Sequence, residues 1–373
     1  MDWATHVIAK HNYYAPEILH DEARDLFGRG WQFAAMTDEL AKDRDFVTLE
    51  HSGASIVVQN FKGSVQAFQN ICSHRFHPIQ TEARGNRILM CAYHGWTYDK
   101  TGFPTGIPKR EQFLSEDNGH LCLTRYPVEV VGKFVFVDRG GGTTTAREQL
   151  GGFADTLLEM SDYLGAETNF ADVPHAANWK LLVENVLECY HCSTVHRDTF
   201  VPWGVGKLPI ADAKFDAGHS SAHFPRQDQP REELRLRYLS HLKERKFDHN
   251  SFFHIHVFPN LFIASSQGLS FYVGQLLPVS AEKTVLRMRN FEPAVELSAK
   301  HRARQEPINA DSIATGMQLI EEDRAILEAI QRGLHLAHAP GAIGDDEVRI
   351  AEFHKHYARS MAGDPAQALI AAE

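Results

Sequence analysis

Two short pairs of metal-ligating side chains lie in the first third of the sequence. One pair is Cys72 and His74, separated by one residue. The other pair is Cys91 and His94, which are separated by two residues and begin after sixteen further residues. Two loops that each offer one thiolate and one imidazole can supply a [2Fe-2S] cluster in which His replaces Cys on one of the irons. We therefore expect these four residues to bind such a cluster from the tips of two β-hairpins.

A zinc site is the alternative for the same four residues. Zinc fingers usually group Cys with Cys and His with His, whereas each pair here mixes the two types. Gly95 and Gly102 lie where turns would bring the backbone close to the cluster sulfurs. Trp96 would either shield the cluster or fill the hydrophobic core. The mixed pairs favour the [2Fe-2S] cluster over zinc.

A second candidate metal site lies in the segment ENVLECYHCSTVH at 184–196, where His191 and His196 are five residues apart. On a straight helix that spacing splays the two side chains by about 140°, so a local irregularity must bring them together. An iron that activates dioxygen commonly takes two His and one carboxylate, which leaves three coordination positions open. From the spacing alone, a structural role for this His pair is the simpler interpretation.

Short strands and turns surround the first candidate site. Residues 45–70 alternate β-branched and polar residues around two glycines, which predicts antiparallel strands joined by turns. The pattern ends at KFVFVDR, and GGGTTT at 140–145 is typical of a linker. We predict a small all-β domain over residues 42–140, and we expect residues 1–41 to pack with the domain that follows.

Residues 141–373 predict a second domain of helices and antiparallel strands, so the fold class is α+β. The segment 226–249 is rich in charged residues and is expected to be exposed. Strand-like runs lie between residues 251 and 293, and His254 and His256 alternate along the first of them, where structural roles are expected. Apolar spacing predicts helices over 146–165, 178–198, 308–334 and 346–362.

The composition is that of an ordinary globular protein. Of the 373 residues, 43% are hydrophobic and 23% are charged, which is enough for two domains with cores of their own. The net charge is -10, from 38 basic and 48 acidic residues, and no stretch concentrates basic residues as a phosphate-tracking surface requires. We therefore expect no nucleic-acid partner.

The N-terminal sequence MDWATHVIAKHNYYAPEIL lacks the apolar core and cleavage signature of a signal peptide. No window approaches the roughly 20 apolar residues of a membrane span. We expect a soluble, cytoplasmic protein with no membrane partner. Five cysteines make an odd number in a long chain, which argues against a disulfide framework and favours metal ligation for Cys72, Cys91, Cys122, Cys189 and Cys192.

The runs CSHRFHP at 72–78 and CAYHGWTYDKTG at 91–102 resemble the Rieske domains of the ring-hydroxylating oxygenase family. The likeness continues through most of the chain, because NWK at 178–180 is followed by an acidic residue, Tyr-His and a second His, as in the family's catalytic domain. The resemblance implies a helix-grip catalytic domain in which His191 and His196 bind a mononuclear iron, Fe(II), that uses dioxygen as co-substrate.

The resemblance also implies the third iron ligand. The run EDRAILEAIQRG at 322–333 is similar to the family's C-terminal helix, whose Asp at the position of Asp323 binds the iron. Glu321 and Glu322 are the competing candidates. Without the resemblance, this acidic run would be taken as a solvated helix face.

Glu188 lies three residues before His191, so on a helix the two side chains would share one face. In the family, the acid at this position bridges the iron ligand to the second cluster histidine of a neighbouring chain, here His94 of the partner subunit. The resemblance therefore implies a head-to-tail ring, a homotrimer, with Glu188 as the catalytic bridge. Many relatives carry Asp at this position, and an ordinary surface carboxylate is the alternative. Asn185 lies one residue closer to His191 than in the naphthalene-type enzymes, so we do not transfer that residue's role.

No GxGxxG follows a strand, and no Cys-x4-Cys-x2-Cys pattern is present. The chain is therefore expected to receive electrons from a separate reductase, with or without a ferredoxin, and to use NAD(P)H only through that partner. An electron carrier is the alternative from another class, although it would not need a second domain of this size. A binding module with a degenerate iron site is a further alternative.

The string ECYHC at 188–192 looks more like the oxygenases that dealkylate quaternary ammonium compounds such as carnitine, glycine betaine and stachydrine. We expect oxidation of a C–H bond of a small molecule, with N-dealkylation as the leading interpretation. Hydroxylation of an aromatic compound and oxidation of a specialised metabolite are the alternatives. Aromatic side chains that would either line the pocket or fill the core are Phe200, Trp203, Phe224, Phe253, Phe271 and Tyr272.

Overall fold

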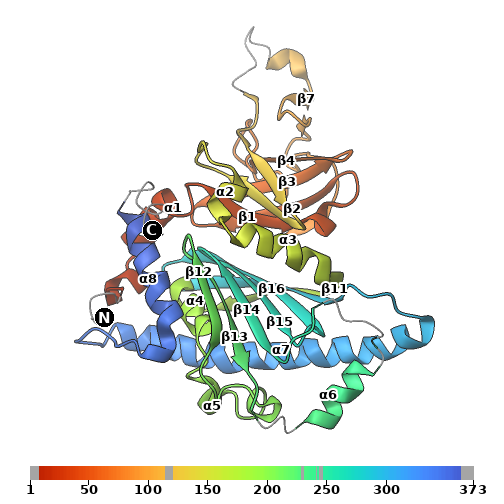
Figure 1. Cartoon of the computed structure of the whole chain (residues 1–373). Coiled ribbons are helices and arrows are strands. Elements are labelled where there is room, and N and C mark those ends of the chain that lie inside the picture. The colour runs from red at the N-terminus through yellow and green to blue at the C-terminus, as the bar shows by residue number, and fades with distance from the viewer. Residues whose placement is uncertain (1–7, 114–120, 228–230, 241, 243–246, 363–373) are drawn as a thin grey trace. The chain divides into compact units, whose positions relative to one another are not determined.

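The computed structural model describes residues 8–113, 121–227, 231–240, 242 and 247–362 (Figure 1). The chain forms two compact units. One unit is Glu22–Gln149, and the other combines the chain up to Asp21 with the chain from Leu150 onward. The first is built of strands and the second of a sheet with helices, so the α+β class predicted from the sequence is confirmed.

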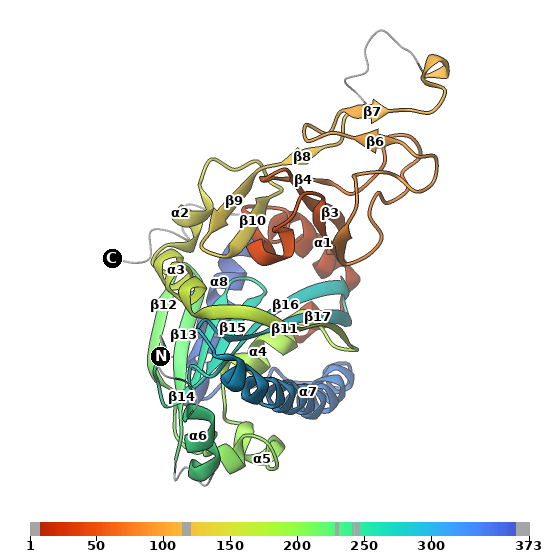
Figure 2. The same cartoon turned by 90° about the vertical axis from the view of Figure 1, so that its right-hand side faces the viewer.

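The strand unit is built around a five-stranded antiparallel sheet with the order β5-β2-β3-β4-β8. Its central strands are β2 (Asp45–His51), β3 (Ala54–Phe61) and β4 (Ser64–Gln69), which confirms the strands predicted over residues 45–70. A two-stranded sheet of β6 and β7 lies close to the candidate cluster loops (Figure 2). The remaining strands are β1 (Trp31–Met36), β5 (Arg84–Asn86), β6 (Thr97–Tyr98), β7 (Pro104–Gly106), β8 (Arg125–Tyr126), β9 (Val128–Val131) and β10 (Phe134–Asp138).

The limits of this unit differ from the expected 42–140 because β1 pairs with β10. Their register places Trp31 opposite Asp138, so the chain from Glu22 belongs to the strand unit. The expected linker at 140–145 also belongs to it, because the indole N–H of Trp31 donates to the carbonyl of Thr144 at 2.7 Å. Only the chain before Glu22 clusters with the second unit.

The second unit is organised by a seven-stranded antiparallel sheet with the order β11-β17-β16-β15-β14-β13-β12. Helix α4 lies between this sheet and the long helix α7 (Figure 2). The space between the sheet and these two helices is where the candidate iron ligands gather. The strands are β11 (Leu164–His175), β12 (Ala211–Asp216), β13 (His219–Pro225), β14 (Ser251–Val257), β15 (Leu261–Ser266), β16 (Ser270–Ser280) and β17 (Lys283–Pro293).

The helices of this unit follow the predicted positions with different limits. Helix α7 (Ala299–Leu334) contains 36 residues and includes Pro307, so it begins well before the expected residue 308. Its first turn is capped by Ser298, whose hydroxyl accepts the amide of His301 at 3.3 Å. None of the helices in the part of the chain that the structure describes has the length and apolarity to cross a membrane. The other α-helices of this unit are α3 (Phe153–Tyr163), α4 (Trp179–Leu187), α5 (Cys192–Val195), α6 (Glu232–Leu239) and α8 (Val348–Met361). Helix α1 (Pro16–Asp25) spans the division at Glu22, and α2 (Ala146–Leu150) spans the division at Leu150.

Short 3-10 helices connect these elements. The one at Val201–Trp203 follows the candidate iron ligands directly and carries an aromatic residue of the pocket described below. The 3-10 helices are η2 (Lys10–Tyr13), η3 (Thr37–Leu40), η4 (Arg110–Gln112), η6 (Val201–Trp203) and η7 (Asp345–Glu347).

Candidate metal centres and their pocket

Two loops with the same backbone pattern carry the four candidate cluster ligands. In the first loop, the amide of Cys72 donates to the carbonyl of His77 at 2.9 Å. In the second loop, the amide of Cys91 donates to the carbonyl of Trp96, also at 2.9 Å. The second turn needs a positive φ of 74°, which Gly95 adopts at no steric cost. The two loops therefore hold the backbone of Cys72 and of Cys91 in the same way.

The donor set of these loops fits a [2Fe-2S] cluster. The thiols of Cys72 and Cys91 are buried in one hydrophobic core, whereas His94 is exposed. The rings of His74 and His94 lie 4.6 Å apart between centroids. The Nδ1 atom of His74 is buried and has no hydrogen-bond partner among the described residues. A Rieske-type cluster has two thiolates on one iron and two imidazoles on the other. The buried thiol pair and the outer imidazole pair, one of whose nitrogens has no partner, match this requirement.

Trp96 has both of the roles that the sequence left open. Its side chain is 2% exposed and packs in the core with the two cysteines. It also stacks on His74, with centroids 4.9 Å apart and planes 6° from parallel. Gly102 was expected to approach a sulfur, but a Cβ there would instead meet the carbonyl of Leu123 and the ring of Phe68, each at 3.1 Å. Gly102 therefore allows close core packing and does not serve the cluster sulfurs.

Tyr98 contacts the candidate cluster site through its hydroxyl group. The hydroxyl lies 3.1 Å from Sγ of Cys72 and 3.0 Å from Oγ of Ser73. Burial, followed by the contact with Cys72, raises the pKa of Tyr98, so the group stays a neutral hydroxyl with a proton to donate. Hydrogen bonds to the sulfurs are one of the factors that set the reduction potential of an iron–sulfur cluster.

We expect Tyr98→Phe to lower the reduction potential of the cluster by roughly 40 mV. The lost hydrogen bond contributes about 1 kcal/mol, and for one electron that energy corresponds to this potential. A spectroscopic redox titration measures the shift. Tyr126→Phe is the control, since Tyr126 lies in β8 of the same unit outside the cluster loops. An unchanged potential in Tyr98→Phe would show that the hydroxyl does not donate to the sulfur.

The candidate iron ligands converge at a break in the helix predicted over 178–198. Helix α4 ends at Leu187, Glu188 is extended with φ -132° and ψ 173°, and the short helix α5 begins at Cys192. This is the local irregularity that the five-residue spacing requires. It places Nε2 of His191 and Nε2 of His196 at 3.3 Å from each other.

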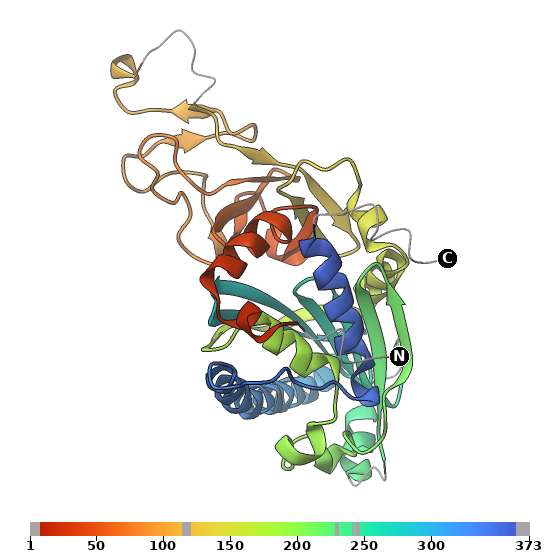
Figure 3. The same cartoon turned by 90° about the vertical axis from the view of Figure 1, so that its left-hand side faces the viewer.

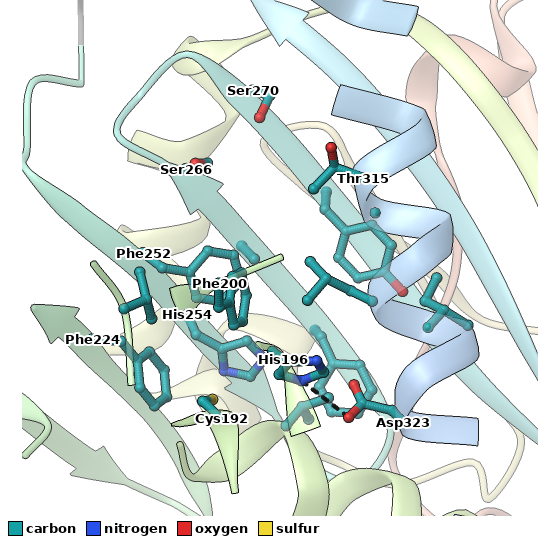
Figure 4. Close-up of a pocket in the computed structure, with 18 of the residues that line it drawn as sticks. Cys192, His196, Phe200, Phe224, Phe252, His254, Ser266, Ser270, Thr315 and Asp323 are labelled. Atoms are coloured by element: carbon teal, nitrogen blue, oxygen red, sulfur yellow. Dashed lines mark ion pairs between the residues drawn. The ribbon is translucent and has the colours of Figure 1, made fainter. Parts of the chain in front are cut away.

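Asp323 of α7 meets His196 across the helix break (Figure 4) and also lies close to His191. Its Oδ1 atom lies 3.1 Å from Nε2 of His196 and 3.6 Å from Nε2 of His191. Two imidazole nitrogens and one carboxylate oxygen therefore face a common point, which is the donor set of a two-His, one-carboxylate iron site. The side chains fit a mononuclear iron, and their role as its ligands stays a prediction.

Two further carboxylates hold the far sides of the imidazoles. Oε1 of Glu188 is paired with Nδ1 of His191, and Oε2 of Glu322 lies 2.8 Å from Nδ1 of His196. Each carboxylate thus accepts a hydrogen bond from Nδ1–H, which leaves the lone pair on the Nε2 atom that faces the site. Burial disfavours charge on His196, but the carboxylates of Asp323 and Glu322 outweigh burial and raise its pKa.

The three acidic residues at 321–323 have different positions relative to the candidate iron site. Glu321 pairs with Arg324 on the exposed side of α7. Glu322, named above as a competing ligand, holds the far side of His196 and the hydroxyl of Thr199, each at 2.8 Å. Only Asp323 presents an oxygen to both Nε2 atoms. Glu188 meets His191 through the turn at 188–191 and not along a helix face, contrary to the expected geometry.

No role is expected for Asn185 from the sequence, but the structure places its side chain in this site. Its amide nitrogen donates to Oδ1 of Asp323 at 3.3 Å and lies 3.5 Å from Nε2 of His191. The sequence does contain a signal for this role of Asn185. The residue lies just before the helix break that the spacing of His191 and His196 requires. Asn185 thus orients the carboxylate of Asp323 from the side of α4.

The expectation that every cysteine ligates metal is wrong for two of the five. Cys189 and Cys192 form a disulfide across the turn that carries His191. A cysteine in a disulfide has no thiolate to offer, although Sγ of Cys192 lies 3.9 Å from Nε2 of His191. The three remaining cysteines, Cys72, Cys91 and Cys122, are free.

A cavity of about 280 Å³ opens in front of the three candidate ligands. Phe200 contacts the ring of His196 with centroids 5.2 Å apart, and Phe252 contacts Phe200 at the same distance (Figure 4). Of the six aromatic residues named from the sequence, five line the cavity, and Phe253 does not. The segment at 226–249, expected to be exposed, contributes Arg226 and Tyr238 to the lining; its residues 228–230, 241 and 243–246 lie outside the described part.

The model of the family "ring hydroxylating alpha subunit (catalytic domain)" matches residues 161–363, more than half of the 373-residue chain. The chain belongs to this family. The Rieske [2Fe-2S] domain model matches residues 30–127 of the alpha subunit, so the chain carries both parts expected from the resemblance. The alpha subunit thus combines a [2Fe-2S] domain with a non-haem iron domain.

Known relatives of this alpha subunit include oxygenases of quaternary ammonium compounds. It is 30% identical over 190 residues to the carnitine monooxygenase oxygenase subunit of Acinetobacter baumannii, covering 49% of this chain and 51% of that protein. It is 32% identical over 205 residues to the glycine betaine monooxygenase oxygenase subunit of Chromohalobacter salexigens, covering 51% and 43%. The chain thus spans about half the length of the relatives that it matches.

The fold of the alpha subunit is also that of a solved structure. A quaternary ammonium Rieske monooxygenase, described with insights into carnitine oxidation and inter-subunit electron transfer, superimposes with a TM-score of 0.75. The match covers 96% of this chain and 94% of that chain at 21% sequence identity. At this identity, the likeness establishes the fold.

Proposed function

We propose that this alpha subunit is the terminal oxygenase component of a Rieske non-haem iron oxygenase, which oxidises a C–H bond of a small molecule. The observation that carries the proposal is the meeting of His191, His196 and Asp323 at one end of an aromatic cavity of about 280 Å³. A bound iron would supply dioxygen activation there, with electrons from the [2Fe-2S] cluster. A binding module would not need three donors aimed at an open coordination face.

The protein's own groups have distinct tasks in this proposal. Glu188 and Glu322 hold the two imidazoles so that Nε2 of each points into the site. Asn185 keeps the carboxylate of Asp323 in position. The aromatic wall that begins with Phe200 excludes water from the side where the substrate would lie. Reactive chemistry would therefore take place in a shielded pocket.

The proposed electron route runs between chains. Glu188 is paired with His191, and the neighbouring Tyr190 is 72% exposed, so this turn presents an unburied aromatic residue at the surface. We propose a head-to-tail ring of three chains in which Glu188 meets His94 of the partner subunit. His94 is exposed, as such a contact requires. A separate reductase, with or without a ferredoxin, would deliver the electrons to the cluster.

For the substrate, we propose a quaternary ammonium compound that also carries a carboxylate. Two relatives are oxygenase subunits for carnitine and glycine betaine, which are zwitterions of this type. The rings of Phe200, Phe252 and Phe224 form a continuous aromatic wall beside the iron site. A quaternary cation has no proton to donate and is commonly held over aromatic faces. This wall is suited to the cationic end of the molecule.

Arg226 supports a carboxylate at the other end. Among the described residues that line the cavity it is the one Lys or Arg, and its Nη2 atom is buried without a hydrogen-bond partner. Nε donates to the carbonyl of Trp203, and Nη1 donates to Oδ1 of Asn250 at 3.2 Å. The guanidinium is therefore fixed in place with one donor left for a substrate oxygen.

The test is turnover with a working reductase on carnitine, glycine betaine and stachydrine. We expect substrate-dependent oxygen uptake and a dealkylated product, with formaldehyde where an N-methyl group is lost. If none of the three gives product while an aromatic acid does, the quaternary ammonium proposal fails and the oxygenase assignment stands. If no compound stimulates oxygen uptake in protein with full iron content, the oxygenase proposal itself fails.

Arg226→Gln is expected to raise KM roughly 10- to 100-fold for a carboxylated substrate, because a charge-assisted hydrogen bond contributes about 1.5–3 kcal/mol. KM for choline, which has the quaternary nitrogen but no carboxylate, should change little. Arg231→Gln is the matched control: its guanidinium also lies over Trp203, at 5.7 Å against 5.9 Å for Arg226, but it does not line the cavity. Equal effects on both substrates would count against the carboxylate contact.

A further inference from the structure

Arg349 is a buried cation in the first turn of α8. Its side chain is 1% exposed and lies against the sheet. Nε donates to the hydroxyl of Ser220 at 3.0 Å, and Nη2 donates to the carbonyl of the same residue at 3.3 Å. Nη2 also lies 3.1 Å from Nδ1 of His254. Three contacts on two sides therefore fix the plane of the guanidinium.

The charge of Arg349 has no counter-ion in the described part of the chain. No carboxylate there forms an ion pair with Arg349, and its Nη1 atom is buried with no hydrogen-bond partner. Burial lowers the pKa of Arg349 to about 9, so the group still carries its charge at neutral pH. A buried charge without a partner is strongly destabilising, and natural proteins usually provide one.

A second cavity, of about 190 Å³, is lined by Arg349 and lies between α8 and the strands β12 and β13. Figure 3 shows α8 passing along this end of the sheet. At the outer end of the cavity, Arg359 is exposed and Phe215 is 41% exposed, so the lining extends from the solvent to a fully buried cation. The volume is below the range of about 300–1,000 Å³ typical of sites for drug-sized ligands. A ligand here must be small.

The other polar groups of this cavity favour an anion. The Nδ1 atom of His219 accepts the amide of Phe258 at 2.9 Å, which places the ring proton on Nε2. Three cations of the lining, Arg349, Lys355 and Arg359, outnumber its two carboxylates, and each carboxylate already accepts a hydrogen bond. Asp216 accepts the amide of Gly152 at 2.7 Å, and Glu352 accepts Lys355 at 2.5 Å. Arg359 adds a further positive charge at the outer end.

We propose that this cavity binds a small oxyanion, with Nη1 of Arg349 as its anchor. The ligand class is inorganic phosphate or sulfate, or the carboxylate of a short acid. An anion would supply both the missing hydrogen-bond partner and the missing counter-charge, and the planar guanidinium is suited to oxyanions. The site is separate from the metal site, and its existence does not depend on the proposed oxygenase function.

Arg349 also connects this site to the metal pocket. Nδ1 of His254 faces the guanidinium, which can only donate, so Nδ1 is the acceptor and Nε2 carries the proton. The ring of His254 lines the metal pocket beside His196 (Figure 4). Burial, and then the charge of Arg349, holds the pKa of His254 well below its usual value, so the ring is neutral. An anion on Nη1 therefore binds the same guanidinium that orients a side chain of the pocket.

Isothermal titration calorimetry on the full chain, with both metals bound, tests the proposal. Phosphate, sulfate and acetate are titrated separately at constant ionic strength, with chloride as the balancing salt. We expect saturable binding of at least one oxyanion with about one site per chain. The two inorganic oxyanions and acetate distinguish an inorganic ligand from the carboxylate of a metabolite. The absence of saturable heat with all three anions would overturn the proposal.

Variants locate the binding. Arg349→Gln should abolish it, and Arg359→Gln, at the exposed outer end, should weaken it several-fold without endangering the fold. Arg332→Gln, an exposed arginine of α7 outside the cavity, should bind as the unchanged protein does. If Arg349→Gln does not fold, a crystal soaked in selenate decides the matter by anomalous scattering. A selenate within hydrogen-bond distance of Nη1 supports the site, whereas a cavity holding only water contradicts it.

Discussion

Replacing His191, His196 or Asp323 with Ala is expected to remove the mononuclear iron and reduce turnover to background, while the visible absorption of the cluster is retained. The three donor atoms lie within 3.6 Å of one another, so the loss of any one leaves an incomplete donor set. The cluster ligands lie in the other compact unit and are untouched. Iron analysis should therefore fall from about three to about two irons per chain.

Three further variants make this result specific. Glu321→Ala is the matched control, because Glu321 lies in the same acidic run but pairs with Arg324 on the exposed face. It should keep both metals and normal turnover. His74→Ala and His94→Ala should do the reverse of the triad variants and abolish the visible absorption. Colour that survives both of these changes would refute the cluster assignment, and full iron content in Asp323→Ala would remove Asp323 from the ligand set.

The sequence was most informative where the chemistry depends on local spacing. The two Cys-His pairs need only their own loops, and the two loops do share one backbone pattern. The five-residue spacing of His191 and His196 correctly required a break, since a regular helix cannot bring both rings to one point. The prediction that Asp323 is the third ligand depended on the family resemblance, because nothing in the local sequence distinguishes Asp323 from Glu321 and Glu322.

The sequence was least informative where function depends on contacts between distant segments. Glu322 has its role because His196, more than a hundred residues earlier, turns Nδ1 toward α7. Arg226 and Tyr238 were expected in an exposed charged segment, yet they line the pocket because the segment folds back beside Trp203. An odd number of cysteines does not exclude a single local disulfide, and Cys189 and Cys192 form one. Pairing is decided locally, at the turn that brings these two together.

The two carboxylates that hold the iron-site imidazoles are expected to differ in their effect on turnover. Glu188→Gln is expected to retain both metals and to lose coupled turnover by more than about 100-fold. Glu322→Gln should reduce turnover or iron affinity only by roughly 10- to 100-fold, the usual effect of losing a partner of a metal ligand. Both changes remove one charged acceptor from an imidazole Nδ1. Their difference therefore reports what Glu188 does beyond orienting His191.

Single-turnover experiments measure that difference directly. The cluster is reduced in advance, substrate and dioxygen are added, and the rate of cluster oxidation is followed by its visible absorption. We expect this rate to collapse in Glu188→Gln and to stay within a few-fold of normal in Glu322→Gln, because only Glu188 lies on the proposed path to His94 of the partner subunit. Equal rates in the two variants would reduce Glu188 to a positioning residue. A monomer with full activity would rule out the ring, since the path then could not cross between chains.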